Sequence, residues 1–142
     1  MARKWVKFPH ADKAFVHQGA ALAKAWPRLH RGDCEPLPKP ADAQSAWSAF
    51  HAGDFARAVE LGRAAGGPAV NAAIKAQAIY ATYLEKSAPA KLALYEEAAN
   101  WADERRNAAP KDANAHYLYA YALGRYSQSI SVAKALAQGY GG

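Results

Sequence analysis

Apolar residues recur at helical spacing along most of the chain, and no run of alternating β-branched residues indicates a sheet. The first such stripe predicts a helix over residues 11–31, with Phe15, Gly19, Leu22, Trp26 and Leu29 on one face. Pro27 should kink or interrupt this helix near its end, because proline removes a backbone donor and crowds the preceding turn. Gly32 and Asp33 should then end it.

A short linker follows, with prolines in alternate positions at Pro36, Pro38 and Pro40. Such a segment cannot be helical, and we expect it to run extended as a stiff spacer. We therefore place a boundary between residues 1–40, a basic helix and linker, and residues 41–142.

The pattern after the linker predicts further helices and an all-α fold. They are a helix pair over 41–66 that turns at Gly53-Asp54, then helices over about 69–86, 88–108, 113–127 and 130–138. Ser87 is the expected N-cap of the helix over 88–108, and Pro89 suits its first turn. Composition agrees, since much of the 51% hydrophobic content is alanine, the best helix former.

Several functional classes are disfavoured by composition. No stretch approaches the roughly 18 continuous apolar residues of a membrane span. The basic N-terminus has no apolar region behind it, so we expect no secretory signal and no membrane partner. The single cysteine, Cys34, excludes an intrachain disulfide and fits a reducing compartment, so we expect a cytoplasmic protein.

The net charge of +6 is concentrated at the N-terminus. Residues 1–39 carry eight Lys or Arg against three acids, whereas residues 40–142 carry ten against nine. The excess is either a solvated helix face or a patch for an acidic partner, nucleic acid included. The residues of this basic patch are Arg3, Lys4, Lys7, Lys13, Lys24, Arg28 and Arg31.

Residues 91–126 resemble tetratricopeptide (TPR) repeats. The segment beginning at Leu92 (Leu-Ala-Leu-Tyr-Glu-Glu-Ala) is followed by Pro110, where a repeat closes, and His116 then takes the Trp position of the next repeat. Ala98 and Ala120 take positions where helices cross closely. The segment is similar to bacterial TPR-like proteins of largely unassigned function, to regulators of microtubule dynamics and to the TPR subunit of TRAP transporters.

This resemblance implies a TPR-like stack of antiparallel helix pairs over about 41–68, 69–110 and an incomplete 111–142. It implies a protein or peptide partner and no reaction. By analogy with TPR geometry, the concave face would present Trp47, His51, Lys75, Tyr83, Tyr117, Tyr121 and Arg125. Tyrosine suits an interface because it buries a large rigid ring while its hydroxyl keeps a hydrogen-bond partner. The other interpretation is that these rings belong to the core. A nucleic-acid adaptor that uses the basic patch is the alternative function.

No constellation favours catalysis, a cofactor or a metal. His30 and Cys34 are four apart, but Gly32-Asp33 should break the helix between them, and no residue is expected to orient His30. No His-x3-His or paired cysteine motif occurs. His51 ends a predicted helix, where a cation interacting with the helix dipole would be sufficient explanation.

The last predicted helix exposes apolar residues that no further helix covers: Ile130, Val132, Ala133 and Leu136. A repeat stack needs a polar cap on its final unit. We therefore expect either a two-fold dimer through this end or a helix that folds back as a cap.

Overall fold

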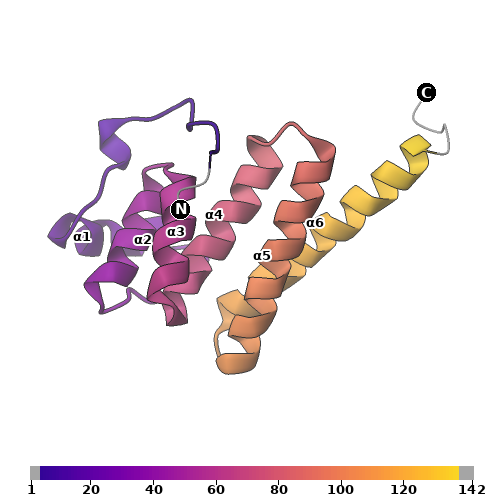
Figure 1. Ribbon diagram of the computed structural model, residues 1–142. Helices are drawn as coiled ribbons and strands as arrows, with labels where there is room; N and C mark the ends of the chain where they lie inside the picture. The colour runs from indigo at the N-terminus through magenta and orange to yellow at the C-terminus, as the bar shows by residue number, and fades with distance from the viewer. Residues whose placement is uncertain (1–3, 138–142) are drawn as a thin grey trace. The chain divides into compact units, whose positions relative to one another are not determined.

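The computed structural model describes residues 4–137, and every regular element in that range is a helix (Figure 1). The chain divides into two compact units, Met1–Ala76 (unit 1) and Gln77–Gly142 (unit 2). The division falls inside helix α4, Val70–Tyr83, which contributes its first turns to unit 1 and its last turns to unit 2. Within residues 4–137, no helix is long and apolar enough to cross a membrane.

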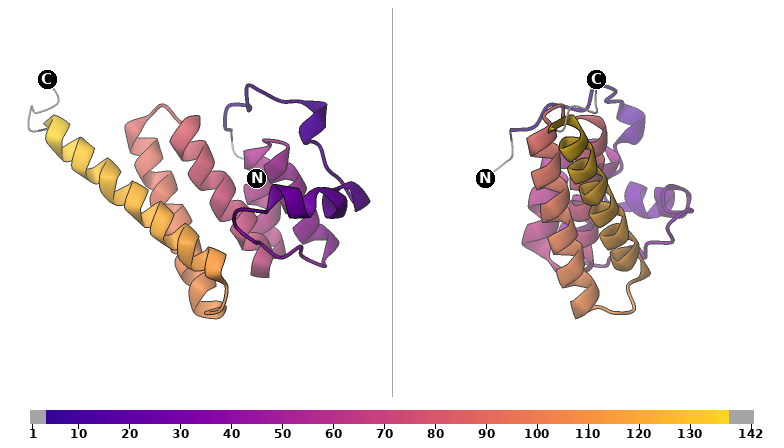
Figure 2. Two further views of the ribbon diagram at one scale, coloured as in Figure 1. Left: turned by 180° about the vertical axis from the view of Figure 1, so that it is seen from behind. Right: turned by 90° about the vertical axis from the view of Figure 1, so that its right-hand side faces the viewer.

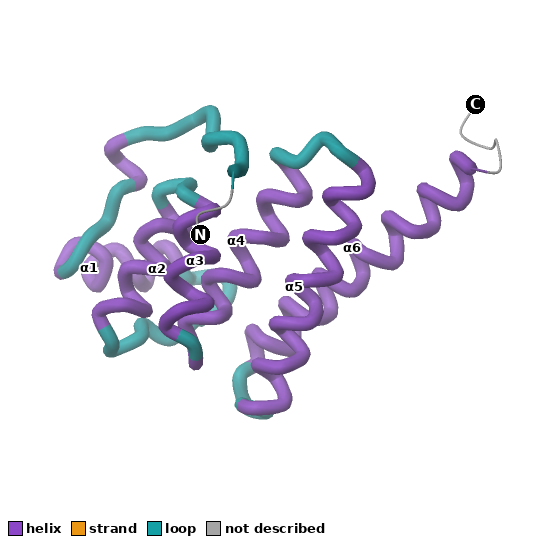
Figure 3. Tube along the Cα trace, viewed as in Figure 1, coloured by secondary structure: helices purple, strands orange, loops and turns teal. Residues whose placement is uncertain are grey.

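Unit 1 begins with a segment that is mostly loop (Figure 3). Its elements are η1 Lys13–Phe15, α1 Ala20–Leu29, α2 Ala41–His51, α3 Phe55–Ala65, η2 Gly67–Ala69 and the start of α4. The helix predicted over 11–31 is wrong in its first half, because α1 starts only after Gly19, which has a φ of 58°. Phe15 is accordingly exposed. The end of the helix and the non-helical proline linker are confirmed.

The turn between α2 and α3 is confirmed at Gly53-Asp54. The Asp54 carboxylate accepts from the Arg57 N–H at 3.3 Å and caps α3. Gly53 has a φ of 82°, and a Cβ there would lie 2.5 Å from Cδ2 of Phe8. Glycine therefore satisfies two requirements, a left-handed backbone and the close approach of the Phe8 ring.

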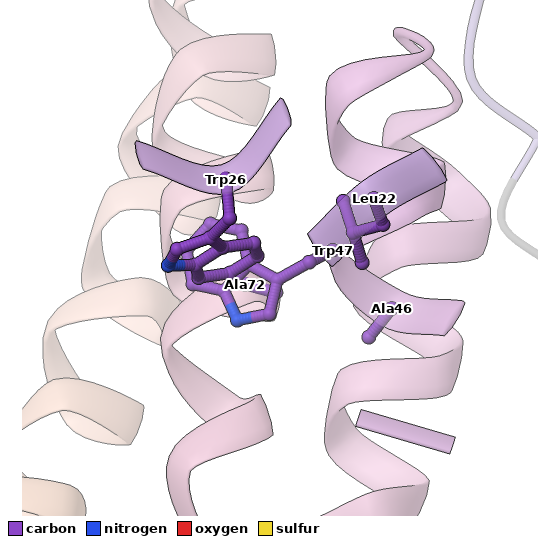
Figure 4. Close-up of a cluster of buried hydrophobic side chains, with 5 residues drawn as sticks. All are labelled: Leu22, Trp26, Ala46, Trp47 and Ala72. Atoms are coloured by element: carbon purple, nitrogen blue, oxygen red, sulfur yellow. The ribbon is translucent and has the colours of Figure 1, made fainter. Parts of the chain in front are cut away.

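The core of unit 1 joins α1 to α2 and α4 (Figure 4). Leu22 and Trp26 of α1 pack with Trp47 of α2, and the two indole rings meet edge to face with centroids 5.7 Å apart. Ala46 and Ala72 complete the cluster. The predicted division after residue 40 thus separates parts of one compact unit.

Unit 2 contains the end of α4, then α5 Ala88–Ala108 and α6 Ala113–Ala137. The bounds of α5 are confirmed, and the Ser87 hydroxyl caps it by accepting from the Ala90 N–H at 3.3 Å. The break predicted between helices over 113–127 and 130–138 is wrong, since α6 is continuous. Gly124 costs a helix only about 1 kcal/mol, and no proline follows to stop it.

Buried small residues line the contact between α5 and α6. Ala98 and Ala102 are buried on α5, where Trp101 is buried beside them. On α6 the buried stripe is Ala115, Leu118 and Ala122. Ala120, expected at a close helix crossing, is exposed, because the inward face of α6 lies two residues away from the position that the repeat pattern assigned to it.

Helix α6 lies beside the C-terminal part of α5 and diverges from α5 further along the chain (Figures 1 and 2). The second half of α6 is therefore separated from the N-terminal part of α5, and the space between them is open on one side.

Candidate partner-binding surfaces

The N-terminal segment covers the residues of unit 1 that the sequence assigned to a partner. Trp47 is only 1% exposed, because the α1 residues Leu22 and Trp26 pack on it. Its predicted role in partner contact is therefore wrong for this conformation. The pattern treated residues 1–40 as separate from the repeats and so could not show that α1 occupies this face.

His30, just after α1, is 3% exposed and uses both ring nitrogens. Nδ1 lies 3.0 Å from Oδ1 of Asp33, and Nε2 lies 2.8 Å from Nε2 of His51. The ring also stacks on Trp26 at 3.9 Å between centroids. Asp33 therefore orients His30, contrary to the expectation that no residue would.

His51 is half-buried and is not the cation expected at a helix end. Burial chiefly lowers its pKa, with further lowering by His30, Lys75 and His17, to about 4. Burial also lowers the pKa of His30, against the opposing effect of Asp33. Both rings are therefore neutral at pH 7, and the histidine pair joins α1 to α2 through an uncharged hydrogen bond.

Lys75, the third predicted partner residue of unit 1, lies beside the same network. Its Nζ is 3.0 Å from Oδ2 of Asp33 and 5.4 Å from the centroid of the Phe50 ring. Burial acts to raise the pKa of Asp33, but the Glu35 N–H, Lys75 and His30 outweigh it, and the pKa lies below its usual value. Lys75 therefore holds the N-terminal segment, which explains why it does not face an open groove.

Glu35 fastens the start of the proline linker to the core. Its backbone carbonyl accepts from Nε1 of Trp26 at 2.7 Å, and its carboxylate accepts from Nδ2 of Asn71 at 3.0 Å. These buried hydrogen bonds connect the linker with α1 and α4. Sequence reasoning missed this role, because nothing in the local pattern shows that Glu35 and Asn71 meet.

The predicted partner residues of unit 2 are more accessible. Tyr83 is 73% exposed and Tyr117 is 63% exposed. Tyr121, one turn after Tyr117, has its ring centroid 6.4 Å from that of Tyr117 and its hydroxyl 3.2 Å from the Thr82 hydroxyl. The Arg125 guanidinium lies 5.4 Å from the Tyr121 ring centroid. The structure thus groups Tyr117, Tyr121 and Arg125 on one face of α6.

A groove of about 520 Å³ continues from this face, and we call it the unit 2 groove. It lies between the end of α4, the start of α5 and the second half of α6, where α6 diverges from α5. The residues that matter below are Thr82, Lys86, Lys91, Leu92, Arg125 and Val132. Only Arg125 belonged to the predicted site, because sequence periodicity did not reveal the divergence of the two helices.

The unit 2 groove has an apolar wall and a basic rim. Leu92 and Val132 provide apolar surface, and Val132 is 53% exposed. Lys86, Lys91 and Arg125 are its charged residues, and no aspartate or glutamate is among the described residues that line it. A concave, mostly apolar site with a few polar groups is the usual form of a ligand site.

The basic patch lies on the surface of unit 1. Its described residues Lys4, Lys7, Lys13, Lys24, Arg28 and Arg31 are all exposed. Arg3 lies outside the described residues. Leu22 and Trp26 point into the core from the same helix as Lys24 and Arg28, so α1 docks by its apolar face and leaves its charges in solvent.

The features weighed for metal binding and catalysis are placed as follows. Among residues 4–137, no group of three or more His, Cys, Asp or Glu side chains could hold a metal ion. Cys34 is exposed, and its Sγ lies 3.9 Å from the carbonyl oxygen of Arg31. His30 makes its hydrogen bonds to Asp33 and His51, so neither of its nitrogens is available as a base for Cys34.

The C-terminal surface expected to drive dimerisation is part of α6 itself. Val132 and Ala133 line the unit 2 groove, and Ile130 is half-buried. The side chain of Leu136 lies outside the described residues. Dimerisation through this end stays a prediction.

Comparison with known proteins finds no matching family model, no matching curated protein and no matching solved structure. The likeness to TPR proteins accordingly rests on the residues quoted above and enters below as a proposal.

Proposed function

We propose that the chain is a non-catalytic protein-binding module that holds a segment of a partner protein in the unit 2 groove. The observation that carries the proposal is the groove itself, bordered by exposed tyrosines. Thr82 lines the groove and is followed by Tyr83, while Tyr117 lies two turns before Arg125 on α6. Large exposed rings beside an apolar cavity are the side chains that most often carry binding energy in protein interfaces.

We also propose that α2–α3 and α4–α5 are TPR-like helix pairs and that α6 is the first helix of an incomplete third repeat. The support is the order of the helices, the Gly53-Asp54 turn and the buried small residues Ala58 and Ala98. The single cysteine favours a reducing compartment, so we propose that binding takes place in the cytoplasm.

Site-directed photo-crosslinking tests this function. A photoreactive amino acid is placed at Val132 or Tyr117, and the matched control position is Glu104, which is exposed on α5 and does not line the groove. In cells of the source organism, we expect the same discrete crosslinked species from positions 132 and 117 and none from position 104. Equal crosslinking from all three positions, or none from any, would contradict the proposal.

The exposed basic patch supports a second candidate function, binding of nucleic acid. Six described cations with only Asp12 among the residues between Lys4 and Arg31 form an electropositive surface suited to phosphates. Titration with a single-stranded oligonucleotide at several salt concentrations tests it. A steep decrease of affinity with salt, reduced by Lys24→Gln and Arg28→Gln, would support this function, and no measurable binding at low salt would exclude it.

A further inference from the structure

The unit 2 groove carries information on the chemistry of its occupant. Its three charged lining residues, Lys86, Lys91 and Arg125, all have the same sign. In the described part of the chain, none of the three makes an ion pair with a carboxylate. Glu85 is adjacent to Lys86 in sequence, but its carboxylate accepts from the Ser87 N–H at 3.1 Å.

The cations come from different elements and converge on one cavity. Lys86 follows α4, Lys91 lies in the first turn of α5, and Arg125 lies in the middle of α6. Arg125 is positioned by its contact with the Tyr121 ring and by a 3.5 Å hydrogen bond from its Nη1 to Oε1 of Gln128. Three positive groups around one concavity produce a field that favours an anionic occupant.

The apolar lining requires more than charge. Leu92 and Val132 provide apolar surface in the groove, with Pro89 and Ala133 beside them. An apolar side chain placed there would be removed from water, which is worth about 1.5–3 kcal/mol for a fully buried Leu or Phe. An inorganic anion would leave this surface uncovered.

We propose that the segment held in the unit 2 groove is a short acidic peptide in which apolar side chains alternate with aspartate or glutamate. This proposal rests on the proposed function and specifies its partner. The apolar side chains of the segment lie against Leu92 and Val132, and its carboxylates face Lys86, Lys91 and Arg125. The groove volume of about 520 Å³ is in the range of sites for small ligands and suits a few residues, not a folded domain.

Fluorescence anisotropy with defined peptides tests the proposal on the full chain. The probe is a labelled, end-capped octapeptide that alternates Glu or Asp with Leu or Phe. The comparison probes replace every acid by its amide, or every apolar residue by serine. We expect the acidic amphipathic peptide to bind at least tenfold more tightly than either comparison probe, and its affinity to decrease as salt is raised. Equal affinity for the amide peptide would overturn the proposal.

Charge reversal locates the binding. The variant Lys91→Glu/Arg125→Glu should weaken binding at least tenfold, and Lys91→Gln/Arg125→Gln should weaken it less. The matched control is Lys39→Glu/Lys111→Glu, which changes the net charge equally at exposed residues that do not line the groove. Circular dichroism establishes that each variant is folded. If the control weakens binding as much as the groove variant, the groove is not the site.

The two proposals fail in different ways. Crosslinking from Val132 in cells, combined with no affinity for the acidic octapeptide, would leave the protein-binding function intact and overturn the acidic partner. Decanoate tests the remaining anionic amphiphile, a small molecule. Binding of decanoate without binding of the peptide would also overturn the peptide assignment. Absence of both crosslinking and peptide binding would overturn both proposals.

Discussion

The Nε2 atoms of His30 and His51 lie 2.8 Å apart, a separation at which one nitrogen must donate a proton and the other must accept it. The Asp33 carboxylate accepts from Nδ1 of His30, so Nε2 of a neutral His30 is an acceptor and His51 donates to it. This assignment of protons follows from the hydrogen-bond network. A second proton on the pair would place two N–H groups against each other and two cations in contact.

Acid should therefore destabilise unit 1 in a defined pH window. Both histidines have folded-state pKa values below the unfolded value of about 6.5, and that of His51 is about 4. The unfolded chain then binds more protons than the folded chain in this window, and stability is lost as the pH falls from about 6.5 to about 4. We expect a loss of about 1–2 kcal/mol, since the His51 ring is partly accessible to solvent.

The variant His51→Gln tests this origin. Glutamine can still donate to Nε2 of His30 but does not titrate, so the unfolding free energy should change less between pH 6.5 and pH 4 than in the unchanged chain. The matched control is His116→Gln, which removes an exposed histidine of unit 2. Urea denaturation at several pH values measures the effect. An unchanged pH dependence in His51→Gln would mean that the pair does not control acid stability.

Removal of the N-terminal segment should leave a helical but weaker protein. The fragment 41–142 loses Leu22 and Trp26 from the core and exposes Trp47. Since burial of each large side chain is worth about 1.5–3 kcal/mol, the loss should be several kcal/mol. Circular dichroism should show helix, with a lower melting temperature than the full chain. Equal melting temperatures would contradict the packing of α1 on α2.

Trp101 of α5 is 7% exposed, so Trp101→Ala should destabilise the protein by about 3–5 kcal/mol, as large-to-small aromatic substitutions in cores do. The control is Tyr117→Ala on the exposed face of α6, for which we expect a change within about 0.5 kcal/mol. Chemical denaturation followed by circular dichroism measures both. A denaturation midpoint for Trp101→Ala equal to that of the unchanged chain would show that the ring is not in the core.

Gly53→Ala should be more costly than an alanine placed at another left-handed glycine. At Gly53 the substitution meets both a φ of 82° and the Phe8 ring, whereas at Gly67 the φ is 54° and nothing lies within 4 Å of a Cβ. We expect about 1 kcal/mol for Gly67→Ala and about 2–3 kcal/mol for Gly53→Ala. Equal unfolding free energies for the two variants would mean that Phe8 does not pack on the turn.

Local patterns predicted the helices well where a signal lies within a few residues. Ser87 and Pro89 gave the start of α5, and Gly53-Asp54 gave the α2–α3 turn. The long helix α6 was divided in the prediction because Gly124 was given too much weight. A single glycine is tolerated when the helix is packed against a neighbour, as α6 is against α5.

The candidate site was predicted only in part, because its residues meet through tertiary packing. Periodicity placed Tyr117, Tyr121 and Arg125 on one face of α6, and the structure groups them. It could not show that α1 covers Trp47. Nor could it show that α6 diverges from α5 and opens the groove lined by Lys91.

The most direct test of the central claim is a two-dimensional NMR titration of the isotope-labelled full chain with the acidic octapeptide. We predict that the amide signals of Lys86, Lys91, Leu92, Arg125 and Val132, which line the unit 2 groove, shift in a saturable manner. Signals of the basic patch on α1 should not shift. Saturable shifts confined to residues 4–31, with the groove signals unchanged, would contradict the account and assign binding to the basic patch.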